Sequence, residues 1–536
     1  MSVDYVLKSG AIFDGISEGP VSGGVAIEGN KIKGIFKAED LDGIKGPMTK
    51  VIDYGDKLIM PGFIDSHMHA GYLIDQRDQT FCVDIAGAKT LEGLLEMMAG
   101  FAEKYPGNKV VFAKGLEVSF FGSAIKPAAK DLDKYFPDKP AIITSRDGYT
   151  YFANTKALEA AGLTKDTPDP KNAIEKDGNG EPTGVIQSEM TDPLKELLIR
   201  APEERVPALI SLLHEMNSYG LTSIGDLYVY GLVKPYPVYK MAEDNLTVRI
   251  HFYPSLVNDF SPESVEEFKR EFNSPFLKFS GFKDYCDGTM RKRTIWMLEP
   301  YTDKPDNNYG EPKTPPEELK RKILNAASLG CAVRIHTNGD AANRFVLDIF
   351  EEAEEKYGKL QVKHSMEHLE MIDPGDIPRI AKLGVIASLQ FRGVIQRIDL
   401  VKELFGEKRE KQAHNWKSIL DAGVDVTTGT DCPFLTFFDP MLTIFSGLTR
   451  TTDDGYPEGG WLPEQKLKLH EILRAYTKGG AVAMSRDDTG SLEEGKLADI
   501  TVLDRNLFDI KDPKEVLGVR PVMTMVDGKI VYEKGA

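Results

Sequence analysis

The pattern of apolar and polar residues divides the chain into two β-rich ends and a long middle. Near the N-terminus, short apolar runs at 4–15, 23–36 and 50–62 are broken by glycine, which indicates strands joined by turns. The C-terminal stretch looks the same, and its Asp527-Gly528 pair is typical of a two-residue hairpin turn. We therefore predict a small β-sandwich domain formed from both termini, residues 1–60 and 490–536.

The middle, residues 61–489, alternates strand-like runs with amphipathic helical stretches, as in a parallel α/β domain. Strand candidates lie at 57–65, 221–227, 247–256, 278–286, 332–338, 362–370, 385–390 and 424–431. Helical stretches at 315–330 and 341–358 flank the fifth candidate, and each ends at a glycine. Eight such units predict an α/β fold closed as a (β/α)8 TIM barrel.

One segment of the middle does not fit a simple repeat of strand and helix. Residues from about 70 to 205 separate the first two strand candidates, which is too long for a loop, and they contain elements of their own. We predict an inserted subdomain that caps the barrel mouth.

Composition and charge exclude several classes of partner. The chain has 536 residues, 41% of them hydrophobic, and a formal net charge of -17. No basic field is available for nucleic acid or an anionic membrane surface, so a small-molecule substrate is expected. No run of about 18 apolar residues and no signal-peptide pattern occurs, which favours a soluble, cytoplasmic protein. A homodimer is compatible with these features.

The cysteines add one constraint on any metal site. The chain has 4 cysteines, and they are far apart, with no CxxC spacing. This pattern indicates neither a disulfide framework nor a thiolate zinc site. A metal would have to be held by nitrogen and oxygen atoms.

The strongest local signal for chemistry is His67 and His69, which follow a short apolar strand in the segment 61–71. Residues two apart in a strand point to the same side, so both imidazoles can face one metal ion. The alternative is two polar residues in a surface turn. Further candidates are His336, His368, Asp431 and Lys283. All four lie at or near the C-terminal ends of strand candidates, where barrel enzymes keep their active sites.

Other roles remain open for several of these residues. His336 could be a histidine of the barrel rim, and His364 competes with His368 within one strand candidate. Asp431 could cap a helix. Lys283 could pair with Asp287, or it could react with CO2 to become a bridging carbamate. Core or surface roles are the default for the remaining histidines, His214, His251, His414 and His470.

The order of motifs resembles the amidohydrolase superfamily, specifically its YtcJ-like branch, amidohydrolase family 3. The resemblance rests on segments spread over nearly the whole chain: 61–71, 147–163, 178–189, 282–294, 300–310, 334–353, 366–390, 429–441 and 490–504. It implies a barrel plus a β-sandwich, one or two divalent metals that are usually zinc, and hydrolysis of amide or related bonds.

The resemblance also implies a ligand set. His67, His69 and Asp431 would bind the more buried metal, and His336 and His368 would bind the second. Lys283, carboxylated, would bridge the two ions.

Two departures from the family pattern concern the substrate. Tyr149 stands where relatives commonly have histidine, and residues 391–393 replace a proline and a histidine. Both changes put the transfer of substrate identity in doubt and leave the ligand set untouched. We expect Arg146, Tyr149 and Asn154 to contact the substrate.

The predicted function is hydrolysis of a carbon–nitrogen bond of a small molecule by a metal-activated hydroxide, with Asp431 moving the proton. On the same fold, a mononuclear deaminase or a lactonase with unmodified Lys283 remains an alternative. A metal-bearing but non-catalytic regulatory or binding protein is the alternative from another class.

Overall fold

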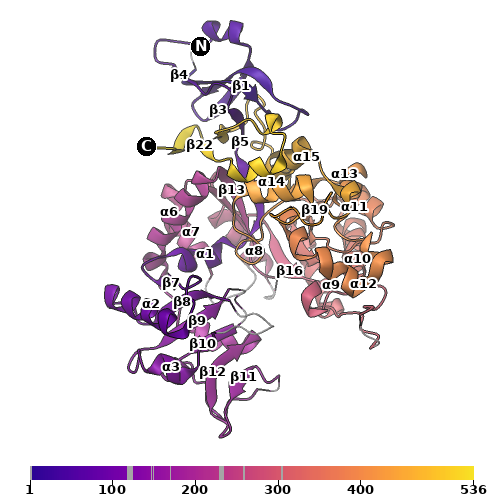
Figure 1. The fold of residues 1–536 in the computed structure, drawn as a ribbon. Helices are drawn as coiled ribbons and strands as arrows, with labels where there is room; N and C mark the ends of the chain where they lie inside the picture. The colour runs from indigo at the N-terminus through magenta and orange to yellow at the C-terminus, as the bar shows by residue number, and fades with distance from the viewer. Residues whose placement is uncertain are drawn as a thin grey trace. The chain divides into compact units, whose positions relative to one another are not determined.

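A computed structural model describes residues 3–117, 125–146, 148, 150–169, 171–227, 234–256, 260–303 and 306–535. The chain forms two compact units, and Figure 1 traces them by colour along the chain. The first comprises Met1–Ala70, Leu213–Val229 and Glu243–Ala536, and the second comprises Gly71–Leu212 and Tyr230–Ala242. The predicted insertion, about 70–205, coincides closely with the longer segment of the second unit. Its role as a cap stays a prediction.

Strands from both ends of the chain form one sheet in the first unit. They are β1 (Tyr5–Ile12), β2 (Val21–Glu28), β3 (Lys31–Phe36), β4 (Lys50–Asp53), β5 (Leu58–Pro61), β21 (Ile500–Leu503), β22 (Pro521–Val526) and β23 (Lys529–Glu533). Their order is β23-β22-β21-β5-β1-β2-β3, with β4 beside β1. The two ends of the chain meet where β5 runs antiparallel to β21, with Met60 opposite Thr501. The second layer of the expected sandwich stays a prediction.

The predicted hairpin turn lies between β22 and β23. Val526 pairs with Lys529 across it, and Asp527 and Gly528 have positive φ angles of 54° and 74°. A Cβ atom at Gly528 would lie 2.3 Å from the Gly29 carbonyl oxygen, so glycine is needed there for space as well as for conformation. The predicted two-residue hairpin turn is therefore confirmed.

Two parallel sheets make up the rest of the first unit's strands. One has the order β15-β14-β13-β6 and the other β16-β17-β18-β19-β20. The strands are β6 (Phe63–Met68), β13 (Leu221–Asp226), β14 (Arg249–Phe252), β15 (Leu277–Phe279), β16 (Phe282–Tyr285), β17 (Val333–Thr337), β18 (Ser365–His368), β19 (Ile386–Leu389) and β20 (Val426–Thr428).

Hydrogen bonds cross both seams between these two sheets. At one seam the Lys283 amide donates to the Pro254 carbonyl over 2.9 Å, beside the end of β14. At the other, the Ser66 hydroxyl donates to the Thr428 carbonyl over 2.9 Å. The strand candidate 278–286 is broken into β15 and β16 around Gly281, whose φ is 129° and whose added Cβ would lie 2.3 Å from the Ala332 oxygen.

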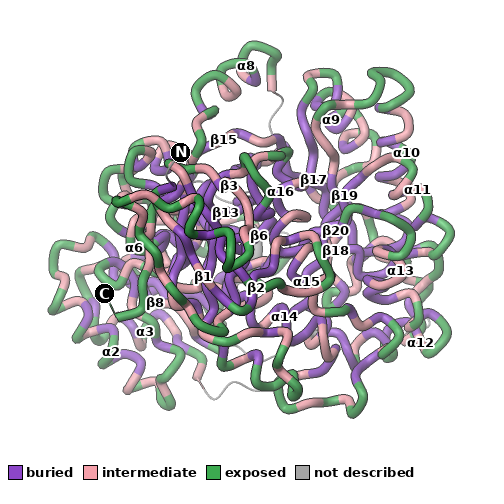
Figure 2. Tube along the Cα trace, turned by 90° about the horizontal axis from the view of Figure 1, so that it is seen from above, coloured by how far each residue is buried: buried purple, intermediate pink, exposed green. Residues whose placement is uncertain are grey.

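Helices of the first unit follow or precede these strands. They are α8 (Pro262–Glu271), α9 (Pro316–Ser328), α10 (Asp340–Tyr357), α11 (Ile377–Leu383), α12 (Ile398–Glu410), α13 (Trp416–Asp421), α14 (Pro440–Thr449), α15 (Leu469–Arg474) and α16 (Gly480–Ala483). Figure 2 shows the strands buried and the outer sides of helices such as α9 and α10 exposed. Among the described helices, none is long and apolar enough to cross a membrane.

The second unit is built around a sheet ordered β11-β12-β10-β9-β8-β7. Its strands are β7 (Cys82–Asp84), β8 (Val111–Leu116), β9 (Ala141–Ser145), β10 (Thr150–Ala153), β11 (Ile174–Lys176) and β12 (Pro182–Gln187). Its helices are α1 (Ala70–Arg77), α2 (Leu91–Lys104), α3 (Ala129–Asp133), α4 (Thr155–Ala160), α5 (Asp192–Glu196) and α7 (Tyr236–Met241), and α6 (Pro202–Ser218) runs across the unit boundary.

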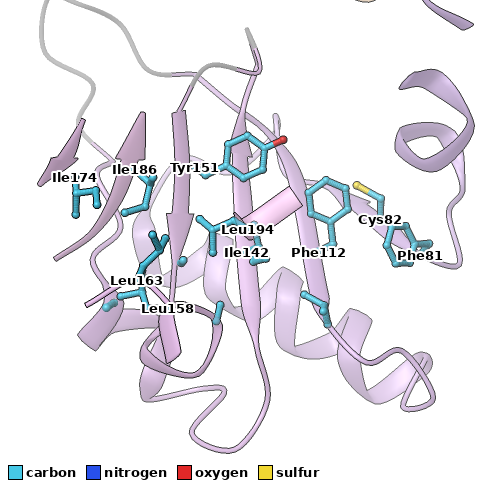
Figure 3. Close-up of a cluster of buried hydrophobic side chains, with 14 residues drawn as sticks. Phe81, Cys82, Phe112, Ile142, Tyr151, Leu158, Leu163, Ile174, Ile186 and Leu194 are labelled. Atoms are coloured by element: carbon cyan, nitrogen blue, oxygen red, sulfur yellow. The ribbon is translucent and has the colours of Figure 1, made fainter. Parts of the chain in front are cut away.

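Apolar side chains cover both faces of the second unit's sheet. Phe112 and Ile142 enter the cluster drawn in Figure 3. Their neighbours Val111 and Ile143 enter a second cluster. Because successive residues of a strand point to opposite faces, both faces of this sheet are packed.

Candidate metal centre

The loop that follows β20 is fixed against β6, in part by the buried carboxylate of Asp65. This carboxylate accepts hydrogen bonds from the Thr430 hydroxyl at 2.6 Å and from the Thr430 amide at 3.1 Å. A Cβ atom on Gly429 would lie 2.5 Å from the His67 nitrogen, so only glycine permits this approach. The Asp431 amide then donates to the His67 carbonyl over 2.7 Å, which brings Asp431 beside the histidines of β6.

Three predicted ligands converge at the C-terminal ends of three strands. Ligand atoms of His67, His368 and Asp431 all lie within 4.8 Å of one another. His67 Nε2 is 3.6 Å from Asp431 Oδ1, and His69 Nε2 is 2.9 Å from the same oxygen. Two imidazoles and a carboxylate at this spacing suit a divalent ion such as zinc. The site therefore fits a metal by the chemistry and the geometry of its donors.

Backbone strain accompanies this convergence. His368 has a φ of 77° and Asp431 a φ of 53°, in the left-handed region that residues other than glycine rarely adopt. Such conformations persist where the surrounding structure enforces them, and they cluster at functional sites. His368 is the last residue of β18, and Asp431 lies three residues beyond the end of β20.

His336 lies beside the cluster, and its ring is engaged elsewhere. Its ring centroid is 4.5 Å from that of His368. However, His336 Nε2 is 2.9 Å from the Gly288 carbonyl oxygen and 3.0 Å from Asn338 Nδ2. The structure thus places His336 next to the three converging ligands with its Nε2 facing protein groups.

Lys283 is buried among the histidines. Its side chain is 0% exposed, and Nζ has no hydrogen-bond partner in the described part of the chain. Burial lowers the pKa of Lys283 to about 8. Its charge in turn contributes to lowering the pKa of His67, of His336 and of His368, after the larger effect of burial on each ring. The ammonium therefore lies close to all three rings.

The alternative pairing of Lys283 with Asp287 is not found. The Asp287 carboxylate accepts backbone hydrogen bonds from Trp296 at 3.0 Å, Asn338 at 2.9 Å and Gly339 at 2.8 Å. Burial nevertheless raises the pKa of Asp287 to about 7. Asp287 holds the loops after β16 and β17 together.

A buried ion pair between Arg334 and Glu367 holds His67 in one tautomer. The sequence analysis did not predict this pair. Glu367 Oε2 lies 2.6 Å from His67 Nδ1, while Arg334 donates to the same carboxylate over 2.7 and 3.2 Å. With its proton on Nδ1, His67 presents the Nε2 lone pair to a metal. Although burial would raise the pKa of Glu367, Arg334 holds it well below its usual value.

Gln390 orients the ring of His368 through Nδ1, as Glu367 orients the ring of His67. Its Oε1 lies 2.6 Å from His368 Nδ1, which directs Nε2 of that ring away from the glutamine. A signal for both positioning residues was present in the sequence. Glu367 directly precedes a ligand, and Gln390 ends the next strand.

His364 has a structural role. Its Nδ1 accepts from the Val333 amide over 3.1 Å, and its ring stacks on Phe350 at 4.6 Å with an interplanar angle of 10°. Burial lowers the pKa of His364 to about 4. Of the two histidines in this segment, the structure therefore brings His368 to the cluster.

The three residues expected to contact substrate fare differently. The prediction that Asn154 contacts the substrate is corrected by the structure. Its buried side-chain amide accepts hydrogen bonds from the Ala141 and Ala157 amides and donates to the Phe136 and Lys139 carbonyls. It caps α4 and has no donor left for a ligand. Arg146 is exposed and pairs with Glu117 at 3.2 Å, so its predicted role remains a prediction. Tyr149 lies outside the described residues.

Comparisons with known proteins agree with this chemistry. Residues 50–532 match the model of the amidohydrolase family. The YtcJ protein of Bacillus subtilis is 29% identical over 99% of both chains, and N-substituted formamide deformylase of Arthrobacter pascens is 27% identical over 95% of both. A metal-dependent hydrolase from Pyrococcus horikoshii has a similar structure, with a TM-score of 0.77 and 25% identity over 95% of this chain and 98% of that one.

The family match covers most of the chain, and the converging histidines and aspartate supply the donors that metal-dependent hydrolysis requires. The chain belongs to the amidohydrolase family and is a metal-dependent hydrolase of carbon–nitrogen bonds other than peptide bonds.

Proposed function

We propose that this enzyme hydrolyses an amide-type bond of a small molecule at a centre of one or two divalent metals, with zinc as the proposed ion. The observation that carries the proposal is the convergence of His67, His368 and Asp431 within 4.8 Å, beside a fully buried lysine. His67, His69 and Asp431 would hold one ion, and His336 and His368 the other. A divalent metal supplies Lewis-acid chemistry, acidifying water and polarising a carbonyl group.

Lys283 would join the ligand set as a carbamate. Its Nζ is buried, and its pKa of about 8 leaves a fraction of neutral amine at neutral pH. That amine nitrogen can attack the carbon of CO2 and release one proton, which leaves an N-carboxylate with two metal-binding oxygens. The reaction exchanges a buried cation for an anion among three histidines, which relieves the repulsion that an ammonium would meet next to a metal.

Asp431 would be the proton carrier. Its Oδ1 already lies within 3.6 Å of two imidazole nitrogens, and the hydrogen bond from His69 lowers its pKa although burial opposes this. The carboxylate would accept a proton from the attacking water and deliver it to the departing nitrogen, so that the nitrogen leaves as a neutral amine. Glu367, held by Arg334 and His67, is unsuited to this role.

The architecture that supports this chemistry is proposed to be a closed (β/α)8 barrel. The hydrogen bonds across both seams of the two parallel sheets support closure. The sheet formed by the two termini would belong to the predicted β-sandwich.

A substrate screen with metal analysis tests the proposal. Purified enzyme would be loaded with zinc or manganese and assayed against N-substituted formamides, N-acyl amino acids, cyclic amides, lactones and amino-substituted heterocycles. We expect turnover of an amide-type compound that falls on chelation and returns with metal. Turnover of only lactones, or deamination with a single metal, would replace the proposed reaction by one of its alternatives.

A further inference from the structure

Three neighbouring segments continue the site beyond its candidate ligands. The Met371 amide donates to the Asn338 carbonyl over 2.8 Å, and the His414 amide donates to the Glu370 carbonyl over 2.9 Å. Glu370 itself is two residues beyond His368. Asn338, Glu370 and His414 therefore lie on adjoining stretches of backbone next to the metal centre.

Each of these residues has a buried polar atom that the protein does not satisfy. Asn338 Oδ1, Glu370 Oε2 and His414 Nε2 have no hydrogen-bond partner among the described residues. The residues are 3%, 6% and 3% exposed. Buried polar atoms are nearly always hydrogen-bonded, and an unpaired carboxylate oxygen is especially costly. Three such atoms on adjoining segments point to a ligand that satisfies them together.

The charges around this cluster define what it can bind. Arg397 binds only one oxygen of Glu370, with Nε at 2.9 Å and Nη2 at 2.8 Å from Oε1, so the other oxygen remains an acceptor. Burial lowers the pKa of His414 to about 3, so its ring is neutral, and with the proton on Nδ1 its Nε2 accepts a hydrogen bond. The amide oxygen of Asn338 only accepts. An anion would meet the Glu370 carboxylate, and an apolar group would leave all three atoms unsatisfied.

We propose that Asn338, Glu370 and His414 form a subsite for a group with at least two N–H donors, such as an ammonium, an amidinium or a carboxamide. Its place in the reaction rests on the proposed function. There it would hold the nitrogen side of the scissile bond, where the departing amine gains protons. The subsite narrows the substrate class to compounds that have a further N–H donor on that side.

Binding of a small cation tests the subsite without turnover. Acetamidinium, which has four N–H donors, would be titrated calorimetrically into the metal-loaded enzyme, with tetramethylammonium as a cation without N–H donors. We expect one acetamidinium to bind per chain and no binding of tetramethylammonium. Absence of acetamidinium binding, or equal binding of both cations, would overturn the subsite.

Two variants assign the binding to these residues. Glu370→Gln should weaken acetamidinium binding about tenfold or more, because a charged acceptor is lost. His414→Asn preserves the left-handed backbone, whose φ is 48°, and should also weaken binding. If Glu370→Gln does not fold, the His414→Asn variant still tests whether these residues bind acetamidinium. Glu351→Gln is the matched control. Glu351 lies on α10 and pairs with Arg379 on α11, and the variant should bind as the wild type does.

Unchanged affinity in a folded Glu370→Gln or His414→Asn protein would refute the assignment. Failure of the proposed hydrolysis in the substrate screen would leave these binding results standing. The two hypotheses can therefore fail separately.

Discussion

The C-terminal ends of the parallel strands in the first unit and the sheet of the second unit are both buried, but with opposite chemistry. On β8, Val111 and Phe112 enter apolar clusters on opposite faces. On β18, Glu367 and His368 are adjacent and both polar, and Lys283 is fully buried nearby. Burying charged groups is costly unless they are paired. Buried polar and charged side chains gather at one set of strand ends, as is typical of a functional site. They make this part of the fold less stable than an apolar core would be.

Backbone conformation shows the same contrast. In the described residues of the second unit, the only non-glycine residue with a left-handed φ is Asn172, and asparagine tolerates that region. At the metal centre the left-handed residues are His368, Leu369 and Asp431, and the leucine side chain cannot compensate that conformation with a local hydrogen bond. The comparison predicts that equivalent substitutions act on function in one region and on stability in the other.

The largest effect is expected for Asp431→Asn. The variant keeps the shape of the side chain and one ligand oxygen but removes the basic oxygen, so turnover should fall about 10²- to 10⁴-fold while metal remains bound. Steady-state rates and metal content would be measured together. Asp133→Asn is the control in the second unit, where Asp133 accepts from Thr155. The Asp133 variant should leave the turnover rate unchanged. If the Asp431 variant lost less than a few-fold in turnover, Asp431 would not be the proton carrier.

Lys283→Ala should lose one of two metals and most activity, with partial recovery in added short carboxylates. The reason is that the proposed carbamate supplies bridging oxygens that alanine cannot. Lys322→Ala is the matched control, because Lys322 is also buried but pairs with Glu318 at 2.6 Å. Elemental analysis that finds equal metal in both variants would contradict the bridge.

A smaller effect on the metal centre is expected for Glu367→Gln. Loss of the carboxylate behind His67 should weaken metal affinity about 10- to 100-fold, and the unpaired Arg334 should reduce stability by about 3–5 kcal/mol. Competition with a chelator and thermal denaturation would measure the two effects. Glu351→Gln breaks a more exposed pair and should change neither by much. Unaltered metal affinity would show that Glu367 serves folding alone.

The sequence predicted that His67, His368 and Asp431 would lie together, and the structure brings their ligand atoms within 4.8 Å of one another. Each residue lies at or near the C-terminal end of a parallel strand, and such ends meet at one edge of a sheet. Their role as metal ligands stays a prediction. Likewise, local backbone preferences were enough to predict the Asp527-Gly528 turn, although Gly528 also lies against the distant backbone of Gly29. These features depend on residues close in sequence or on a simple rule of topology.

What the sequence did not predict depends on long-range packing. The hydrogen bond between His67 and Glu367 joins residues 300 positions apart, which no periodicity encodes, and Arg334 pairs with the same glutamate. The break at Gly281 lies at a close approach to Ala332, the residue before β17. Asn154 was read as a substrate contact because its position in a family motif does not reveal where its amide points.

The smallest expected effect tests the corrected role of Asn154, in the second unit. Serine is also a good helix cap, so Asn154→Ser can keep the acceptor for the Ala157 amide of α4. It loses both donors to the Phe136 and Lys139 carbonyls, which should cost about 1–3 kcal/mol of unfolding free energy. Because no donor of Asn154 faces a ligand, KM and metal content should equal those of the wild type. Asn506→Ser, at the start of a short helical turn near the C-terminus, is the control and should cost less, because the Asn506 amide donates only to the nearby Asp509. A large rise in KM without a change in denaturation midpoint would restore Asn154 to the substrate site and would remove the contrast between the two regions at this residue.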